Sequence, residues 1–157
     1  MADQSMYDKL AATAKAHLHA CRPVTPGSSD PDPEAIKAHL SPSFHIDFGH
    51  KFFVSSTPPL QGEKTADGFI AHMTGMAAKL QTYTLDILDV CVDVEKRTVT
   101  QRVEFHMVPK GGEEVLNDII FWMVMDESGE KVVRITEFVD AAAAAELAKR
   151  MQAGSAS

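Results

Sequence analysis

The second half of the chain constrains the fold most, because it is built from long strand-like segments joined by short turns. Four segments read "TYTLDILDVCVDVE", "TVTQRVEFHMVP", "VLNDIIFWMVMD" and "KVVRITEFVD", over residues 82–95, 98–109, 115–126 and 131–140. They alternate apolar with polar residues or are rich in β-branched and aromatic ones, as strands are. The turns between them, such as "KGGE" and "ESGE", contain glycine, which tolerates positive φ. The pattern predicts an antiparallel meander.

The first half is predicted to be mainly helical. Apolar residues recur at helical spacing over 4–20, and a short helix is expected over 34–40, after the N-cap residue Asp32. A third helix is expected over 66–80, where Thr65 provides the cap.

The remaining segments complete an α+β pattern. "SFHIDF" (43–48) predicts a strand, and a further short strand is possible around 52–54. The alanine-rich stretch 141–152 predicts a last helix, and 153–157 a frayed tail. Helices that precede a meander indicate an α+β fold, and 157 residues fit one domain, 1–157.

Charge, apolar runs and cysteine content argue against nucleic-acid and membrane partners and predict the cellular compartment. The net charge is -7 and no basic patch is visible, which argues against nucleic acid. No apolar run approaches the roughly 20 residues that a membrane span needs. The first residues do not resemble a secretory signal. Cys21 and Cys91 are too far apart for a zinc motif, so we expect free thiols and a cytoplasmic protein.

No cofactor or metal is expected. The sequence contains neither a glycine-rich phosphate loop nor a GxSxG nucleophile motif. His17 and His19 form an HxH pair, but on a helix their rings point in roughly opposite directions. His45, Asp47 and His50 have no recognised ligand spacing.

The order of elements and three short stretches resemble a known family. They are "LSPSFHIDFGH", "PPLQGEKTADGFIAHM" and "FWMVMDESGEKVVRITEFVD", within residues 4–140. The chain resembles the SnoaL-like branch of the nuclear-transport-factor-2-like superfamily. That resemblance implies a cone, in which a curved, mostly antiparallel sheet packs on three N-terminal helices, with a short C-terminal helix. It also implies a pocket on the concave face and, in many members, a homodimer through the convex face.

Strand 98–109 carries two rows that face opposite sides. One row is Arg102, Glu104 and His106, and the other is Val103, Phe105 and Met107. Either the charged row faces water and the apolar row the core, or the charged row lines the pocket and the apolar row a partner.

The resemblance favours the second assignment. Matching the final turn to that of ketosteroid isomerases places Ile135 and Glu137 on the pocket side, and the hairpin register then places Ile120 and Trp122 beside them. The expected concave residues are Arg102, Glu104, His106, Asp118, Trp122 and Glu137. The expected convex, dimer-forming residues are Val103, Phe105, Met107, Ile119, Phe121 and Met123. A shift of one residue inverts this result.

A histidine among carboxylates in an apolar cavity suits proton transfer. The predicted catalytic residues are His106, Asp118, Glu104 and Glu137. The predicted substrate-binding residues are Arg102, Trp122, Tyr7, Phe48, His50 and His72. Phe48 stands where ketosteroid isomerases carry their general base, which argues against a simple steroid isomerase.

Three functions remain open. The first is a cofactor-independent isomerase, cyclase or dehydratase that acts on a small, hydrophobic, oxygenated polyketide or terpenoid. The second is a non-catalytic, dimeric ligand-binding or interaction domain. The third is an epoxide hydrolase in which Asp118 and Arg102 hold a water molecule.

Overall fold

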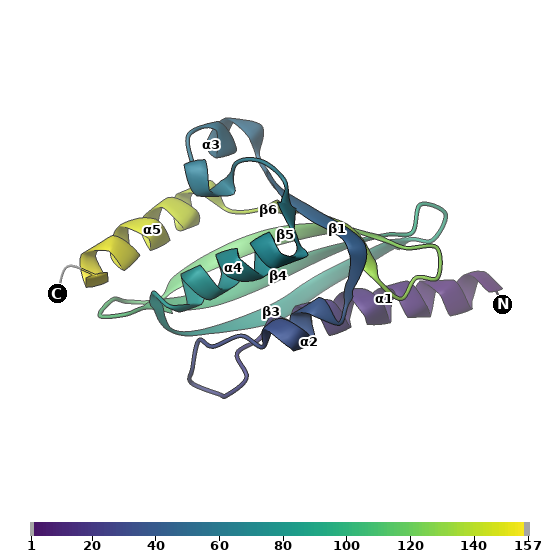
Figure 1. The fold of residues 1–157 in the computed structure, drawn as a ribbon, viewed down its shortest axis with the longest axis horizontal. Coiled ribbons are helices and arrows are strands. Elements are labelled where there is room, and N and C mark those ends of the chain that lie inside the picture. Colours follow the sequence, from purple (N-terminus) through teal and green to yellow (C-terminus); the bar gives the residue numbers. More distant parts are fainter. Residues whose placement is uncertain (1, 156–157) are drawn as a thin grey trace.

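The computed structural model describes residues 2–155, which form one mixed sheet and a set of helices (Figure 1). The helices are α1 (Ala2–Ala20), α2 (Pro33–Lys37), α3 (Lys51–Ser55), α4 (Ala66–Ala77) and α5 (Ala141–Ser155), with a 3₁₀ turn η1 (Pro58–Leu60). The strands are β1 (Leu40–Gly49), β2 (Lys64–Thr65), β3 (Leu80–Asp93), β4 (Thr98–Pro109), β5 (Val115–Met125) and β6 (Val132–Phe138).

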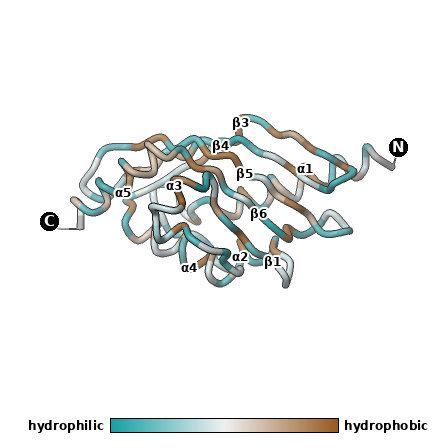
Figure 2. The backbone as a smooth tube through the Cα atoms, turned by 90° about the horizontal axis from the view of Figure 1, so that it is seen from above, coloured by the Kyte–Doolittle hydropathy of each residue, from teal (hydrophilic) through white to brown (hydrophobic). Residues whose placement is uncertain are grey.

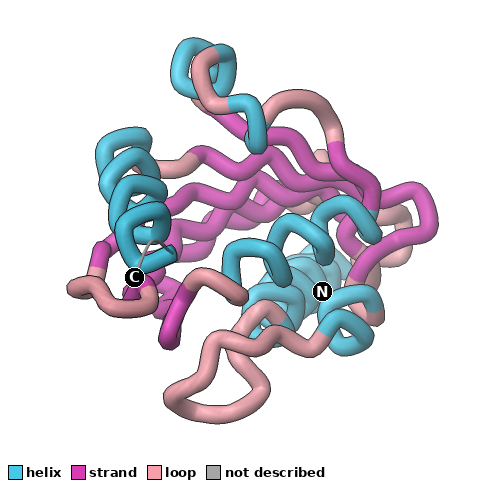
Figure 3. Tube along the Cα trace, turned by 60° about the vertical axis from the view of Figure 1, so that its left-hand side comes forward, coloured by secondary structure: helices cyan, strands magenta, loops and turns pink. Residues whose placement is uncertain are grey.

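The sheet is an open, curled layer with strand order β2-β1-β6-β5-β4-β3. All neighbours are antiparallel except β1 and β6, which run parallel. The strands curve around the helices, as Figure 3 shows. The predicted α+β class, the meander and the mostly antiparallel curved sheet are confirmed.

Helices α1 and α4 pack on the inner face of this sheet, and α5 contacts β4 and β5 near one end of the molecule (Figure 1). The N-caps behave as predicted. The Asp32 side chain accepts hydrogen bonds from the backbone N–H groups of Glu34 and Ala35. The Thr65 hydroxyl accepts one from the N–H of Gly68. These caps fix where α2 and α4 begin.

Three predicted element assignments are wrong. Residues 52–54 belong to helix α3 and not to a strand, because hydroxyl groups of Ser55, Ser56 and Thr57 donate to the carbonyls of Phe52 and Phe53 and close a compact helical turn. Helix α3 also means that more than three helices precede the meander. At the C-terminus, α5 extends to Ser155, so 153–155 are helical; 156–157 lie outside the described residues.

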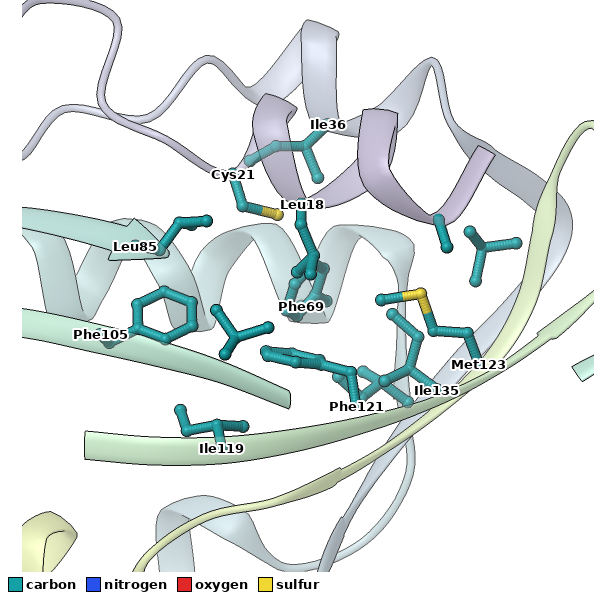
Figure 4. Packing of buried hydrophobic residues seen from close by; sticks show 14 of the residues in the cluster. Leu18, Cys21, Ile36, Phe69, Leu85, Phe105, Ile119, Phe121, Met123 and Ile135 are labelled. Carbon is teal, nitrogen blue, oxygen red and sulfur yellow. The ribbon is translucent and has the colours of Figure 1, made fainter. Parts of the chain in front are cut away.

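The core lies between the inner face of the sheet and the helices. Side chains of Phe105, Ile119 and Phe121 extend from the sheet toward Leu18 and Phe69 on the helices (Figure 4). Apolar and polar stretches alternate along the strands when the chain is coloured by hydropathy (Figure 2). No helix among residues 2–155 is long and apolar enough to cross a membrane.

The two rows of β4 face the opposite way from the prediction. Val103, Phe105 and Met107 are 0%, 7% and 6% exposed and belong to the core. Ile119, Phe121 and Met123 on β5 are buried with them. The predicted convex, dimer-forming row is therefore the inner face of the sheet.

A single bulge accounts for this inversion. Met125 lies opposite Val132, but Val124 lies opposite Arg134, so Val133 is an extra residue in β6. Without it, Trp122 would lie opposite Ile135, which is the register that the sequence suggested. With it, Trp122 lies opposite Thr136, and every residue of β4 and β5 changes face relative to Glu137.

Candidate active site

A cavity of about 840 Å³ lies between the inner face of the sheet and the helices. That volume is within the range of about 300–1,000 Å³ typical of small-molecule sites. Its wall is mostly apolar and comes from the sheet, α1, α4, α5 and the α3–η1 segment. The aromatic and large aliphatic lining residues include Leu18, Phe48, Phe53, Phe69, Met76, Phe105, Ile119, Phe121 and Leu147.

Few polar groups interrupt this wall, and some of them are already engaged. The Tyr83 hydroxyl donates a 2.6 Å hydrogen bond to the backbone carbonyl of Cys21. Burial raises the pKa of that phenol and raises the pKa of the Cys21 thiol to about 12, so both groups are neutral. The negative charge of Glu137 is a second, smaller cause of the raised pKa of the Cys21 thiol.

Glu137 is the acidic residue of the cavity wall. Its strand position on β6 is opposite Phe121 on one side and Phe48 on the other, so aromatic side chains flank the carboxyl. It makes no hydrogen bond or ion pair with any residue that the structure describes. The surface that Glu137 does expose opens into the cavity. Burial raises the pKa of the carboxyl from about 4.5 to about 7.

His72 on α4 lines the same cavity, and its ring centroid lies 5.5 Å from that of Phe48. Burial, followed by the nearby charge of Lys64, lowers the pKa of its imidazole, so the ring is neutral at pH 7. Because Phe48 lies beside Glu137 in the sheet and its ring packs against that of His72, the three side chains occupy one region of the wall.

The structure thus brings together three of the residues predicted from sequence: Glu137, Phe48 and His72. The other members of the charged row lie on the outer face. Arg102 and Asp118 form a hydrogen-bonded ion pair there. The Arg102 Nε–H group donates to both carboxylate oxygens of Asp118 at 3.1 Å, and Nη2 donates to one of them at 2.5 Å. The Arg102 guanidinium lowers the pKa of Asp118, which keeps that carboxyl ionised.

The remaining outer residues are also remote from the cavity. His106 contacts Glu114 at 3.1 Å, and Glu104 lies opposite Asp118 on the outer face. Trp122 is 51% exposed and does not line the cavity. The prediction that these side chains face the pocket is therefore wrong, because the bulge at Val133 shifts the register.

Two further predicted contacts with the pocket are not made. Tyr7 is 40% exposed near the start of α1 and is absent from the cavity wall. His50 is exposed just before α3, and its ring packs on Phe138 at a centroid distance of 5.2 Å. Tyr7 was predicted from a tyrosine on the first helix of ketosteroid isomerases, and His50 from its place after the first strand; neither argument fixes the direction of the side chain.

Asn117 is a lining residue that the sequence prediction missed, because it was assigned to the outer face. It is the polar exception in the row Val115, Asn117, Ile119, Phe121 and Met123, and that exception was visible in the sequence. Within residues 2–155, no three His, Cys, Asp or Glu side chains gather where they could bind a metal ion.

Comparison with known proteins identifies the fold through solved structures and not through sequence. No protein-family model matches the sequence, and no curated protein matches it significantly. Solved structures do match the fold. The pinacolase BvnE from Penicillium brevicompactum aligns with a TM-score of 0.77 and 16% identity, over 96% of this chain and 98% of that one. PrhC from Penicillium brasilianum aligns with a TM-score of 0.77 and 19% identity, over 96% and 93%.

A third structure identifies the fold by its description. A protein from Jannaschia sp. CCS1, described as a SnoaL-like polyketide cyclase, aligns with a TM-score of 0.66 and 12% identity, over 90% of this chain and 92% of that one. The chain has the SnoaL-like fold. The predicted cone architecture is confirmed, and the low identities limit the likeness to the fold itself.

Proposed function

We propose that this SnoaL-like chain is a cofactor-independent enzyme that isomerises, cyclises or dehydrates a small, hydrophobic, oxygenated polyketide or terpenoid in the cytoplasm. The observation that carries the proposal is Glu137, an unpartnered carboxyl in an apolar cavity with a pKa of about 7. The outer row of Arg102, Glu104 and His106 no longer supports catalysis, so the proposal rests on the inner face.

A carboxyl with this pKa is close to half protonated at neutral pH, so it works in both directions of proton transfer. As a carboxylate, Glu137 removes a proton from a carbon next to a substrate carbonyl and leaves an enolate. As the resulting acid, it returns that proton to another carbon, which completes an isomerisation, or to a departing hydroxyl, which releases water.

His72 completes the reacting region of the wall. Its neutral imidazole presents one N–H donor and one acceptor nitrogen, and neither is engaged by a described residue. It is placed to hydrogen-bond the substrate oxygen while Glu137 moves the proton, and the ring of Phe48 between them is a surface on which a flat substrate stacks.

The comparisons support the proposal that the chain is an enzyme. The fold is shared with a pinacolase and with a protein described as a SnoaL-like polyketide cyclase. An epoxide hydrolase that used Asp118 and Arg102 has no support, because that pair lies on the outer face.

Hydrogen–deuterium exchange into 2-tetralone, a two-ring ketone with acidic C–H bonds, tests the proposal without the natural substrate. In D₂O the wild-type chain should accelerate exchange, and Glu137→Gln should reduce the enzymatic rate about a hundredfold or more. Asp118→Asn, which removes an outer carboxylate, should leave the rate unchanged. No acceleration by the wild type, or equal rates for wild type and Glu137→Gln, would favour the non-catalytic ligand-binding domain.

A homodimer through the outer face belongs to the same proposal, with a different set of residues from the one expected. Leu116, Ile120 and Trp122 are 46%, 43% and 51% exposed on that face, which is more apolar surface than a solvated sheet requires. Trp122→Lys should convert a sedimenting dimer to a 17.1 kDa monomer. A wild-type chain that sediments as a monomer at micromolar concentration contradicts this part.

A further inference from the structure

The solvent-exposed residues of the cavity wall show where the cavity reaches the surface. Apart from Pro59, all of those that the structure describes belong to α4, to the turn that ends α4, or to α5. The exposed lining residues are Ala71, Gly75 and Lys79 from the first helix and Ala145, Ala148 and Gln152 from the second. Residues three or four apart share one side of a helix, so each set forms one edge of an opening.

The two edges flank the same opening. Helices α4 and α5 both end beside Lys110, whose N–H group donates to the carbonyl of Lys79 at 3.1 Å and whose own carbonyl lies against Gly154. Helix α5 begins directly after β6, the strand of Glu137, and α4 packs on β1, the neighbour of β6 (Figure 1). The mouth of the cavity is therefore a slot between α4 and α5.

Gly75 lies within α4, where glycine is an unfavourable residue. A glycine in the interior of a helix destabilises it relative to alanine, because more backbone freedom is lost on folding. The φ angle of Gly75 is not positive, so the backbone does not require glycine. Close packing does not require it either. A Cβ atom at Gly75 would have no described atom within 4 Å beyond its chain neighbours and the backbone of its own helix. The fold thus gives no reason for this glycine, whereas an open mouth does.

The slot leads directly to the reacting region of the wall. Gly75 is three residues from His72, so the two are neighbours on the surface of α4, and both line the cavity. Met76 on α4 and Met151 on α5 are partly buried and line the same cavity. Methionine side chains are unbranched and adaptable, so they can change rotamer as a molecule passes.

We propose that ligands enter the cavity through the slot between α4 and α5, and that Gly75 keeps this slot open and limits the cross-section of the molecules that pass. Ala148 stands on the opposite edge, so a larger side chain at either position narrows the same opening. Use of the slot by a substrate rests on the proposed function; the route itself does not.

Cys21 provides a reporter of entry, because its thiol is buried and lines the cavity. The chain has two cysteines, so in a Cys91→Ser background Cys21 is the single thiol. N-Ethylmaleimide is a small reagent, and N-(1-pyrenyl)maleimide carries four fused rings. With either one, the sulfur bonds to one carbon of the maleimide double bond and the thiol proton ends on the other. The ratio of the two labelling rates cancels the intrinsic reactivity of the thiol and reports the size limit of the route.

Gly75→Leu in this background should lower the labelling rate of the pyrenyl reagent relative to that of the ethyl reagent about tenfold or more, because close-packed helices yield little to an oversized group. Ala148→Leu should lower the ratio in the same way from the other edge. Ala78→Leu is the control, since Ala78 is exposed next to the end of α4 but lies outside the cavity wall. It should leave the ratio unchanged. Mass spectrometry of the intact chain measures both rates.

A change in stability does not produce the expected result. Gly75→Leu should raise the urea midpoint, because leucine is favoured over glycine in a helix. If Cys21 were labelled only after unfolding, that gain would slow both reagents by the same factor and leave their ratio unchanged.

An unchanged ratio in Gly75→Leu and Ala148→Leu, an equal fall in Ala78→Leu, or no labelling of Cys21 in the folded chain overturns the proposal. The outcome is separable from that of the proposed function. A ratio that falls as expected, in a chain that does not accelerate exchange into 2-tetralone, would reject the catalysis and keep the route. Exchange that depends on Glu137 together with an unchanged ratio would reject the route alone.

Discussion

The two faces of β4 and β5 differ in a way that explains where a site can form. The outer face holds the residues that stand out in the sequence, but Arg102 and Asp118 pair with each other there and His106 contacts Glu114. The inner face is almost entirely apolar, and two of its few polar side chains, Glu137 and Asn117, have no hydrogen-bond partners among the described residues. Chemistry is expected where a polar group is left unsatisfied and desolvated, not where charges are most numerous.

The largest expected effect is the difference in stability loss between truncating two adjacent aromatic residues on β5. Phe121→Ala removes a side chain that is 4% exposed and should lower the free energy of unfolding by about 3–5 kcal/mol. Trp122→Ala removes one that is 51% exposed and should cost far less under conditions where the chain is monomeric. Urea denaturation of both variants measures the difference. A larger loss for Trp122→Ala in a monomer would mean that the faces are assigned the wrong way round.

A smaller effect is expected from the pH dependence of stability. Below pH 4.5, Glu137 is protonated in both the folded and the unfolded state. Between about pH 4.5 and 7 the folded state keeps a proton that the unfolded state has lost, so stability falls as pH rises, by about 3 kcal/mol in total. The loss levels off above the folded-state pKa.

Glu137→Gln should remove that part of the pH dependence, since the amide does not titrate. Comparing the urea midpoints of wild type and variant at pH 5 and pH 8 isolates the contribution. The variant should gain much more stability relative to wild type at pH 8 than at pH 5. An equal difference at both pH values would mean that the carboxyl is not desolvated in the folded state.

The smallest effect is expected on the outer face. Asp118→Asn breaks the ion pair with Arg102, but under conditions where the chain is monomeric both partners are solvent-exposed and screened, so the urea midpoint should barely change. Added salt should reduce the difference between variant and wild type further. A large destabilisation of the monomer would contradict the assignment of this pair to a solvated face.

Most of the fold could be predicted from the sequence because it depends on local signals. Helical periodicity, the caps at Asp32 and Thr65 and the glycine turns placed nearly every element. The assignment of β4 and β5 to a face relative to Glu137 could not be predicted, because it depends on whether one strand contains an extra residue. The bulge at Val133 has no sequence signature of its own. Because successive side chains of a strand point to opposite faces, one extra residue reverses the face of all the residues that follow.

The site was predicted only in part for the same reason. Glu137 was found through its position after the final turn, which does not depend on the register between β5 and β6. Phe48 and His72 came from β1 and α4, outside the shifted pair. Asn117 was missed because its position was tied to that register, although one amide in an apolar row distinguishes it once the face is known.

The central claim is that the inner carboxyl is the reactive one, and a single NMR titration compares it with its outer counterpart. Selective ¹³C labelling of the Asp and Glu carboxyls, assigned through Glu137→Gln and Asp118→Asn, follows both groups in one sample. Glu137 should titrate near pH 7 and Asp118 below its ordinary value of 3.8. A Glu137 midpoint near 4.5 would show a solvated carboxyl and contradict the account.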